Sequence, residues 1–163
     1  MNAPPPLTPP TWREVPAGEL DVRTLHDVLK LRSAVFVVEQ DCAYQDVDGQ
    51  DLLEGTVHLL AETEIGSGAG LAAYARVLGP DAEHDAPRIG RVIVTGAARG
   101  QQLGRRLVER ALEVCAREHP GRAVELGGQA HLVPFYASLG FEPVGEVYDE
   151  DGIAHQWMRR PVG

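Results

Sequence analysis

The sequence predicts an α+β fold in which a mixed, mostly antiparallel sheet carries helices on its faces. Three observations support this prediction. Short apolar runs bounded by glycine and proline recur along the chain, as is typical of strands and turns. Two longer segments, about 23–36 and 101–119, repeat apolar residues at helical spacing. Near the C-terminus, two strand-like runs flank Asp149–Gly152, which favours a hairpin.

The first ten residues contain five prolines and predict a disordered or extended tail, followed by one domain over residues 11–163. A ligand for an SH3-type domain is the alternative role for this tail. The elements expected next are a strand at 12–15, a helix at about 23–36, an acidic loop at 41–55, and strands at 58–62 and 71–78 joined by the glycine-rich turn 66–70.

The second half of the chain alternates strands and helices. The expected elements are a loop at 79–87, a strand at 88–94, a helix at about 101–119, a strand at 123–126, a helix at about 132–139, and strands at 144–148 and 153–158. Pro120-Gly121 ends the longer helix, and Gly140 ends the shorter one. The longer helix is expected to bury one apolar face that includes Leu107 and Cys115.

Composition places the chain among ordinary soluble domains, with 163 residues, 44% hydrophobic and 24% charged. A net charge of −9 argues against nucleic-acid and anionic-membrane partners. No apolar run approaches the roughly 18 residues of a membrane span, and the start has no signal-peptide pattern. Two cysteines make no disulfide framework, so the expected compartment is the cytoplasm.

Residues 99–106 form a glycine turn between the strand 88–94 and the long helix. The first N–H groups of a helix have no internal partners, and its dipole adds positive charge there, so this end suits a phosphate. Arg91, Arg99, Arg105 and Arg106 lie nearby in the sequence. These residues by themselves fit an anionic cofactor site and an ordinary strand-to-helix turn about equally well.

Two motifs resemble those of GNAT-type N-acyltransferases. Arg99-Gly-Gln-Gln-Leu-Gly104 is similar to the family's acyl-CoA-binding motif Gln/Arg-x-x-Gly-x-Gly/Ala, with Gln102 in place of the middle glycine. His131-Leu-Val-Pro-Phe-Tyr-Ala-Ser-Leu-Gly-Phe141 is similar to a later motif beside the cofactor thiol. The segments that resemble the ElaA-like branch are 31–40, 44–49, 73–77 and 150–155.

The resemblance implies the GNAT fold, with a splay between the strands at about 88–94 and 123–128. It also implies transfer of an acetyl or other short acyl group from acetyl-CoA or another acyl-CoA to a primary amine, by direct attack in a ternary complex. Tyr136 matches the position of the acid that serves the departing thiolate. The residues implied to bind acyl-CoA are Val92, Ile93, Val94, Arg99, Gly100, Gln101, Gln102, Leu103, Gly104 and Arg105.

The general base is less determined by the sequence. An amine must be neutral to attack a thioester, so some group or water must accept its proton. Glu39, His58 and His131 are the candidates, and solvent is the alternative. Histidine suits this task because its charge changes near neutral pH. His131 could equally cap the helix that follows it.

The charged residues of the first half raise two further questions. Arg32, Arg76 and Arg91 lie in or beside apolar segments, which predicts ion pairs with Glu39, Asp46 or Asp48. The acidic loop does not match a calcium loop, because an EF-hand counted from Asp46 needs glycine where Asp51 stands. No other metal spacing occurs, so no metal is expected, and the loop is interpreted as bordering an acceptor that could be cationic.

The expected partners are acyl-CoA and a small-molecule or peptide amine, with the chain a monomer or homodimer. Two alternatives to the acyltransferase remain open. One is an enzyme similar to acyl-homoserine-lactone synthases, because Arg32-x-x-Val35-Phe36 resembles the start of those proteins. The other is a non-catalytic acyl-CoA sensor or interaction module, which would bind CoA and release no thiol.

Overall fold

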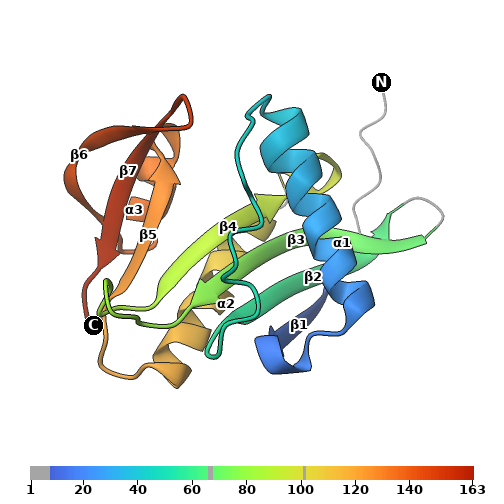
Figure 1. Cartoon of the computed structure of the whole chain (residues 1–163), viewed down its shortest axis with the longest axis horizontal. Coiled ribbons are helices and arrows are strands. Elements are labelled where there is room, and N and C mark those ends of the chain that lie inside the picture. Colours follow the sequence, from blue (N-terminus) through green and yellow to red (C-terminus); the bar gives the residue numbers. More distant parts are fainter. Residues whose placement is uncertain (1–7, 66–67, 101) are drawn as a thin grey trace.

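The structure, a computed structural model, describes residues 8–65, 68–100 and 102–163. Within these ranges, seven strands form one sheet in the order β1-β2-β3-β4-β5-β7-β6 (Figure 1). Every neighbouring pair is antiparallel except β4 and β5, which are parallel. The predicted α+β class with a mixed, mostly antiparallel sheet is therefore confirmed.

The helices and strands occur in the predicted order. The strands are β1 (Thr11–Pro16), β2 (Val57–Ile65), β3 (Gly68–Leu78), β4 (Arg88–Val94), β5 (Val124–Gln129), β6 (Glu142–Glu150) and β7 (Ile153–Arg160). The helices are α1 (Val22–Arg32), the π-helix η2 (Ser33–Glu39) that continues it, α2 (Leu103–Glu118) and α3 (Val133–Ala137). Short 3-10 turns are η1 (Ala17–Glu19), η3 (Gly96–Ala98) and η4 (Ala130–Leu132).

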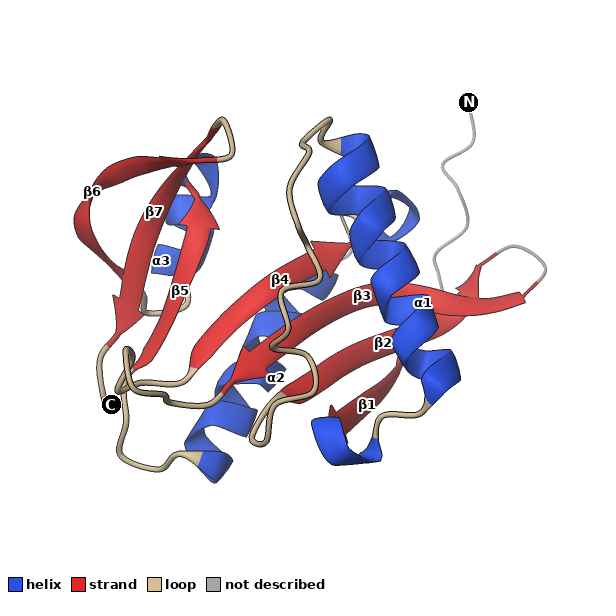
Figure 2. Ribbon diagram, in the orientation of Figure 1, coloured by secondary structure: helices blue, strands red, loops and turns tan. Residues whose placement is uncertain are grey.

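Helices cover both faces of the larger half of the sheet (Figure 2). Alternate residues of the strands face opposite ways, so each face has its own apolar layer. Leu59 packs with Leu107 of α2 on one face, and Leu60 packs with Val28 of α1 on the other. These layers fix β1–β4 between α1 and α2, and α3 covers β5–β7 on the same side as α2.

Several bounds differ from the predictions. Of the turn predicted at 66–70, residues 68–70 belong to β3, and residues 66–67 lie outside the described residues. The helix predicted to end near residue 36 continues in π-helical form to Glu39. The helix predicted over 132–139 is a 3-10 turn followed by the short helix α3. The predicted tail reaches residue 10, but Thr8 already bonds to Thr63 of β2 at 3.0 Å. Residues 1–7 of that tail lie outside the described residues.

The sheet opens between β4 and β5. These strands pair at one position, Arg88 with Glu125, and then diverge, which confirms the predicted splay (Figure 2). Beside the opening, β4 bulges against β3, and Arg91 takes a left-handed backbone conformation with φ +53°. The diverging strands leave room in the sheet that side chains do not fill, and the candidate site lies there.

Candidate active site

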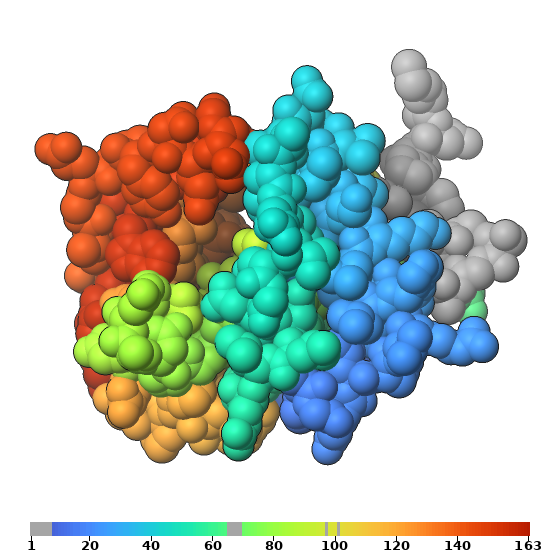
Figure 3. Space-filling model, viewed as in Figure 1, coloured from blue at the N-terminus to red at the C-terminus, as the bar shows by residue number. Residues whose placement is uncertain are grey.

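A cleft of about 1160 Å³ occupies the splay. One part of its wall, here called the α2 side, comes from the end of β4, the start of α2, and α3. The opposite part, here called the hairpin side, comes from β6 and β7. Figure 3 shows the hollow between the C-terminal strands and the segment near residues 40–50.

The α2 side brings together the residues that the family resemblance implies for acyl-CoA binding. Val92, Ile93 and Val94 line the cleft, and so do Arg99, Gly100, Gln102, Leu103, Gly104 and Arg105. Gln101 lies outside the described residues. Gly104 lies close to β4, because a Cβ atom there would be 3.4 Å from Val94 Cγ2. A Cβ atom would also be 3.9 Å from Phe135 Cζ, so the start of α2 packs against β4 and α3 at this glycine.

The turn before α2 explains why glycines are useful in this motif. Gly100 has φ +85°, and Gln102, the residue before the helix, has φ +56°. Left-handed backbone costs a residue with a side chain about 1–2 kcal/mol, whereas glycine adopts it freely. Gln102 stands where the motif has a glycine, and it adopts the left-handed backbone conformation despite this cost. The turn therefore keeps the conformation that a glycine would allow at this position.

The four arginines expected near this turn separate into two groups. Arg99 and Arg105 line the cleft: Arg99 donates to the Val94 carbonyl at 3.1 Å and to Glu39 at 3.0 Å, and Arg105 donates to Ser138 Oγ at 3.0 Å. The expectation was wrong for Arg106, which does not line the cleft, whereas Arg91 does line it but has its charge already paired. Arg106 lies over the ring of Trp12, and the guanidinium of Arg91 faces carboxylates of the acidic loop.

Tyr136 projects from α3 into the cleft lining with its ring largely buried. The ring rests on Gly128 of β5, where a Cβ atom would be 2.9 Å from Tyr136 Cε2. No hydrogen-bond partner for its hydroxyl is found among the described residues. Burial raises the pKa of Tyr136 to about 12, so the phenol keeps its proton at neutral pH. It can therefore donate that proton to an anion in the cleft.

The three candidate bases lie in different places. His58 is fully buried and does not line the cleft, with Nδ1 2.7 Å from Tyr74 Oη and Nε2 2.9 Å from the Asp51 carbonyl. Burial lowers the pKa of His58, and both nitrogens are engaged, so it cannot serve a substrate. Glu39 is exposed and paired with Arg99. His131 is exposed and lines the cleft at the turn before α3.

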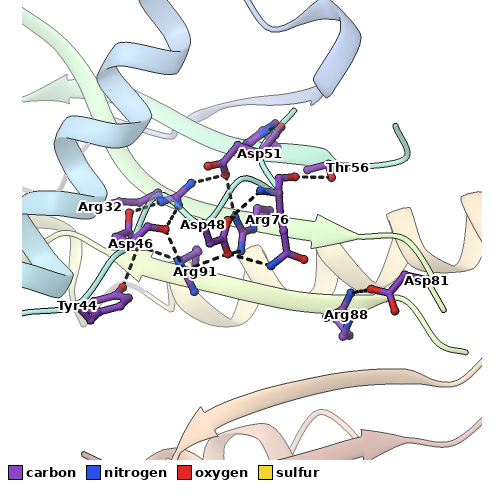
Figure 4. A network of polar contacts seen from close by, with 12 residues as sticks. Arg32, Tyr44, Asp46, Asp48, Asp51, Thr56, Arg76, Asp81, Arg88 and Arg91 are labelled. Carbon is purple, nitrogen blue, oxygen red and sulfur yellow. Dashed lines mark hydrogen bonds and ion pairs between the residues drawn. The ribbon is translucent and has the colours of Figure 1, made fainter. Parts of the chain in front are cut away.

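A buried ion network holds the acidic loop against the sheet (Figure 4). Arg32 donates to Asp46 at 2.8 Å and to Asp51 at 2.5 Å. Arg76 donates to Asp51 at 2.9 Å, and to both oxygens of Asp48 at 2.9 and 2.7 Å. Arg91 pairs with Asp46 at 2.8 Å and with Asp48 at 3.3 Å. The predicted pairs with Asp46 and Asp48 are confirmed, and Asp51 joins them. The prediction was wrong for Glu39, which pairs with Arg99.

The network pairs three of the acidic side chains of the loop. Burial by itself would raise the pKa of Asp48 and of Asp51, but hydrogen bonds from Arg76 and Arg32 respectively outweigh it and hold both pKa values below the ordinary range. Three carboxylates, those of Asp46, Asp48 and Asp51, face three guanidinium groups, whereas Asp41 and Glu54 of the same loop are exposed. Among the described residues, no cluster of three or more His, Cys, Asp or Glu is arranged to hold a metal ion.

The hairpin side contains polar residues that the sequence did not single out as catalytic. Tyr148, Glu150, His155 and Trp157 line the cleft there. His155 Nδ1 is 2.8 Å from the Ile153 carbonyl, and its Nε2 is 3.3 Å from Glu150 Oε2. The Tyr148 ring stacks on His155 with centroids 5.9 Å apart. Residues 150–155 belong to a segment that resembles the ElaA-like branch, which was the available signal for them.

The segment after η2 bridges the two halves of the molecule. Gln129 of β5 donates to Gln40 Oε1 at 3.4 Å, and Cys42 Sγ is 3.4 Å from the Asp151 carbonyl. These contacts join the segment after η2 to β5 and to the turn between β6 and β7, on the hairpin side of the cleft. The cleft is therefore lined by residues from both halves of the sequence.

Fold and site together define a class of protein, and comparison with known families agrees. The chain belongs to the GNAT acetyltransferase family, because the model of that domain matches residues 31–161. It is 48% identical to protein ElaA of Escherichia coli K12 over 151 residues, which are 93% of this chain and 96% of ElaA. A UPF0039 protein of Schizosaccharomyces pombe is 42% identical over 143 residues, 87% of this chain and 91% of that one.

Solved structures show the same relationship. The crystal structure of E. coli ElaA matches with a TM-score of 0.85 at 46% identity, covering 93% of this chain and 99% of that chain. An acyl-CoA N-acyltransferase from Pseudomonas aeruginosa also matches at 0.85, with 45% identity and the same coverage. The acyl-homoserine lactone synthase BjaI matches at 0.68 with 19% identity, covering 92% and 82%, and shares the fold alone.

In the part of the chain that the structure describes, no helix has the length and apolar character needed to cross a bilayer.

Proposed function

We propose that the protein transfers an acetyl or other short acyl group from acyl-CoA to a primary amine, by direct attack within a ternary complex. The observation that carries this proposal is the cleft in the splay, which brings together the N-terminal end of α2 and the buried phenol of Tyr136. Its volume of about 1160 Å³ exceeds the roughly 300–1,000 Å³ of pockets for one drug-sized ligand. That size supports simultaneous binding of two substrates.

The α2 side is the proposed donor site. The free N–H groups at the start of α2, together with Arg99 and Arg105, suit the phosphates of CoA. Backbone groups of Val92–Val94 on the edge facing β5 are available to the pantetheine arm of CoA, because β4 and β5 pair only at Arg88 and then diverge. Acyl-CoA supplies the activated carbonyl, and the chain's own residues bind and orient it.

Tyr136 is the proposed acid for the departing thiolate. Its ring is fixed between Phe135 and Phe141, with centroids 5.0 and 6.0 Å away, so the hydroxyl is held in place. The raised pKa keeps the proton on oxygen until a thiolate forms nearby. Arg99 and the helix end attract the cofactor, whereas Tyr136 acts when the C–S bond breaks.

The test is release of free thiol from acetyl-CoA across a panel of amines. Tyr136→Phe removes one hydroxyl and keeps the ring, so we expect kcat to fall about 10²-fold or more with little change in CoA affinity. Tyr74→Phe is the matched control, because it removes a buried hydroxyl away from the cleft. The control should lose some stability and keep its kcat.

The same assay separates the alternatives. If the protein binds CoA but releases no thiol with any amine of the panel, it is the non-catalytic sensor. Unchanged kcat in Tyr136→Phe would assign this tyrosine to packing only. Preference for an acceptor of the kind used in acyl-homoserine-lactone synthesis would favour that activity, for which the structure offers a shared fold only.

A further inference from the structure

The hairpin side of the cleft carries a histidine–carboxylate pair with no role in the donor site. His155 is on β7, and Glu150 is at the end of β6. The His155 side chain is 13% exposed, whereas that of Glu150 is 58% exposed. The histidine is therefore fixed inside the cleft, and the carboxylate reaches the solvent at its mouth.

The hydrogen bonds of His155 assign its tautomer. A carbonyl oxygen only accepts hydrogen bonds, so the Nδ1 that faces Ile153 at 2.8 Å carries the proton. In the neutral ring, Nε2 then holds a lone pair, and this lone pair faces the Glu150 carboxylate at 3.3 Å. Two acceptors face each other across this gap. A cation or an added proton between them would be stabilised by both.

The pair lies on the opposite side of the sheet from Tyr136. Tyr136 rests on the face of β5 toward which a Cβ atom of Gly128 would point. Neighbouring residues of a strand face opposite ways, so Gln129 and its cross-strand partner His155 face the other side. Gln129 bonds there to Gln40, and a Cβ atom of Gly127 would meet Tyr148 and Trp157 on that same face. Tyr136 and His155 thus lie on opposite faces of the sheet, one on each side of the opening between β4 and β5.

We propose that His155 is the base for the acceptor amine and that Glu150 binds this amine as an ammonium ion. The inference rests on the proposed function and names the acceptor class as a primary alkylammonium. The Glu150 carboxylate holds the cation, and one N–H proton moves to His155 Nε2. The imidazolium so formed is paired with Glu150, and the neutral amine is released for attack on the thioester.

The protons and electron pairs balance. The amine lone pair forms the C–N bond, and the C–S bond breaks with its electron pair on sulfur, which takes the proton of Tyr136. The nitrogen loses its second proton as the amide forms, and this proton restores the phenol through solvent. His155 returns its own proton to solvent, so one proton is released for each ammonium acylated.

Other carboxylates and histidines near the cleft are less suitable. Both oxygens of Asp48 accept hydrogen bonds from Arg76, so that carboxylate is already committed. Glu39 is paired with Arg99 and lies outside the cleft lining. His131 precedes the helix that carries Tyr136. Tyr148 stacks on His155, and Cys42 contacts Asp151 beside Glu150. The other titratable or charged groups of the cleft lining, apart from those of the α2 side, are Tyr44, Asp48, Arg76, Arg88 and Arg91.

The decisive variant is His155→Asn. The asparagine amide can replace Nδ1 as the donor to the Ile153 carbonyl, but it has no Nε2 to accept a proton. We expect kcat with the best alkylamine from the panel to fall about 10²-fold or more at neutral pH. CoA binding, measured as a rise in melting temperature, should be unchanged. His26→Asn, on the exposed face of α1, is the matched control and should keep wild-type kinetics.

The pH dependence separates a base from a structural residue. As the pH approaches the ordinary pKa of an alkylamine, about 10, free amine needs no base. The deficit of His155→Asn should therefore shrink toward wild-type rates as pH rises. A deficit that stays constant across the range would show a structural role and overturn the proposal. Wild-type activity in His155→Asn at neutral pH would also overturn it.

Glu150→Gln tests the binding half of the proposal. We expect KM for the alkylammonium to rise about tenfold, with a smaller change in kcat, because the charge that holds the cation is gone. Glu146→Gln, an exposed residue on the same strand outside the cleft lining, is the control. An unchanged KM would contradict the assignment of Glu150. Failure of the proposed function is a different result: the wild-type protein would bind CoA and acylate no amine. The assignments of His155 and Glu150 are judged from the variants, against an active wild-type protein.

Discussion

Two sets of arginines in this protein have the same chemistry and opposite surroundings. Arg32 and Arg76 lie in the ion network with side chains 0% and 3% exposed. Arg99 and Arg105 lie at the start of α2 with side chains 52% and 41% exposed. Each member of the first set binds two carboxylates, and each member of the second set pairs with one exposed glutamate.

The difference separates structural charges from charges available to a ligand. A buried guanidinium with fixed partners is costly to remove, because its carboxylates are left without compensation inside the protein. An exposed pair contributes about 0–1 kcal/mol, so an incoming anion can displace its partner easily. We therefore expect the first set to control stability and the second to control CoA affinity.

The largest effect is expected from the buried set. Arg32→Met keeps an unbranched apolar stem and removes the charge, which leaves Asp46 and Asp51 each without one partner. We expect a loss of about 3–5 kcal/mol in the free energy of unfolding, measured by urea denaturation. Arg99→Met is the matched change in the exposed set and should cost less than about 1 kcal/mol. Equal losses would remove the distinction between the sets.

The next effect tests the helix end beside the exposed set. Gly104→Val places branched atoms between α2 and Val94, where a single Cβ atom would already be at 3.4 Å. We expect the rise in melting temperature caused by acyl-CoA to disappear while the fold survives. Gly104→Ala adds only that Cβ atom and should keep most of the shift. Normal CoA binding by the valine variant would place the pyrophosphate elsewhere.

The buried set and its neighbour His58 should make stability depend on pH. Burial lowers the pKa of His58, so only the unfolded chain binds its proton as the pH falls below about 6.5, and stability declines from there. Asp48 and Asp51 have lowered folded pKa values, so their contribution is present above about 3.9 and is lost below it. Thermal unfolding across this range should show both declines, and His58→Gln should remove the upper one.

The smallest effect concerns the exposed arginines one at a time. Arg99→Gln should raise the Kd of CoA by up to about fivefold at low salt, because one exposed charge is lost. The difference from wild type should shrink as salt increases, since exposed charges are screened beyond about 8 Å at physiological ionic strength. Calorimetric titration at two salt concentrations measures this. A salt-independent loss would indicate a buried contact instead.

The sequence by itself determined the class of fold, the order of the elements and the α2 side of the cleft. These follow from local physics: apolar spacing sets strands and helices, and a glycine turn before a helix places free N–H groups at a predictable point. The resemblance of 99–104 and 131–141 then predicted the splay and pointed to residues that line the cleft, because each motif is continuous in the chain.

Only the tertiary structure decided which charges meet. Asp51 joins Arg32 and Arg76 across 19 and 25 residues of chain, and the same loop's carbonyl occupies His58, which removes that histidine from the candidate bases. His155 reaches the cleft through the register of β7 on β5. Such pairings depend on how strands align and which faces they share, and a one-residue shift in register would turn each side chain away.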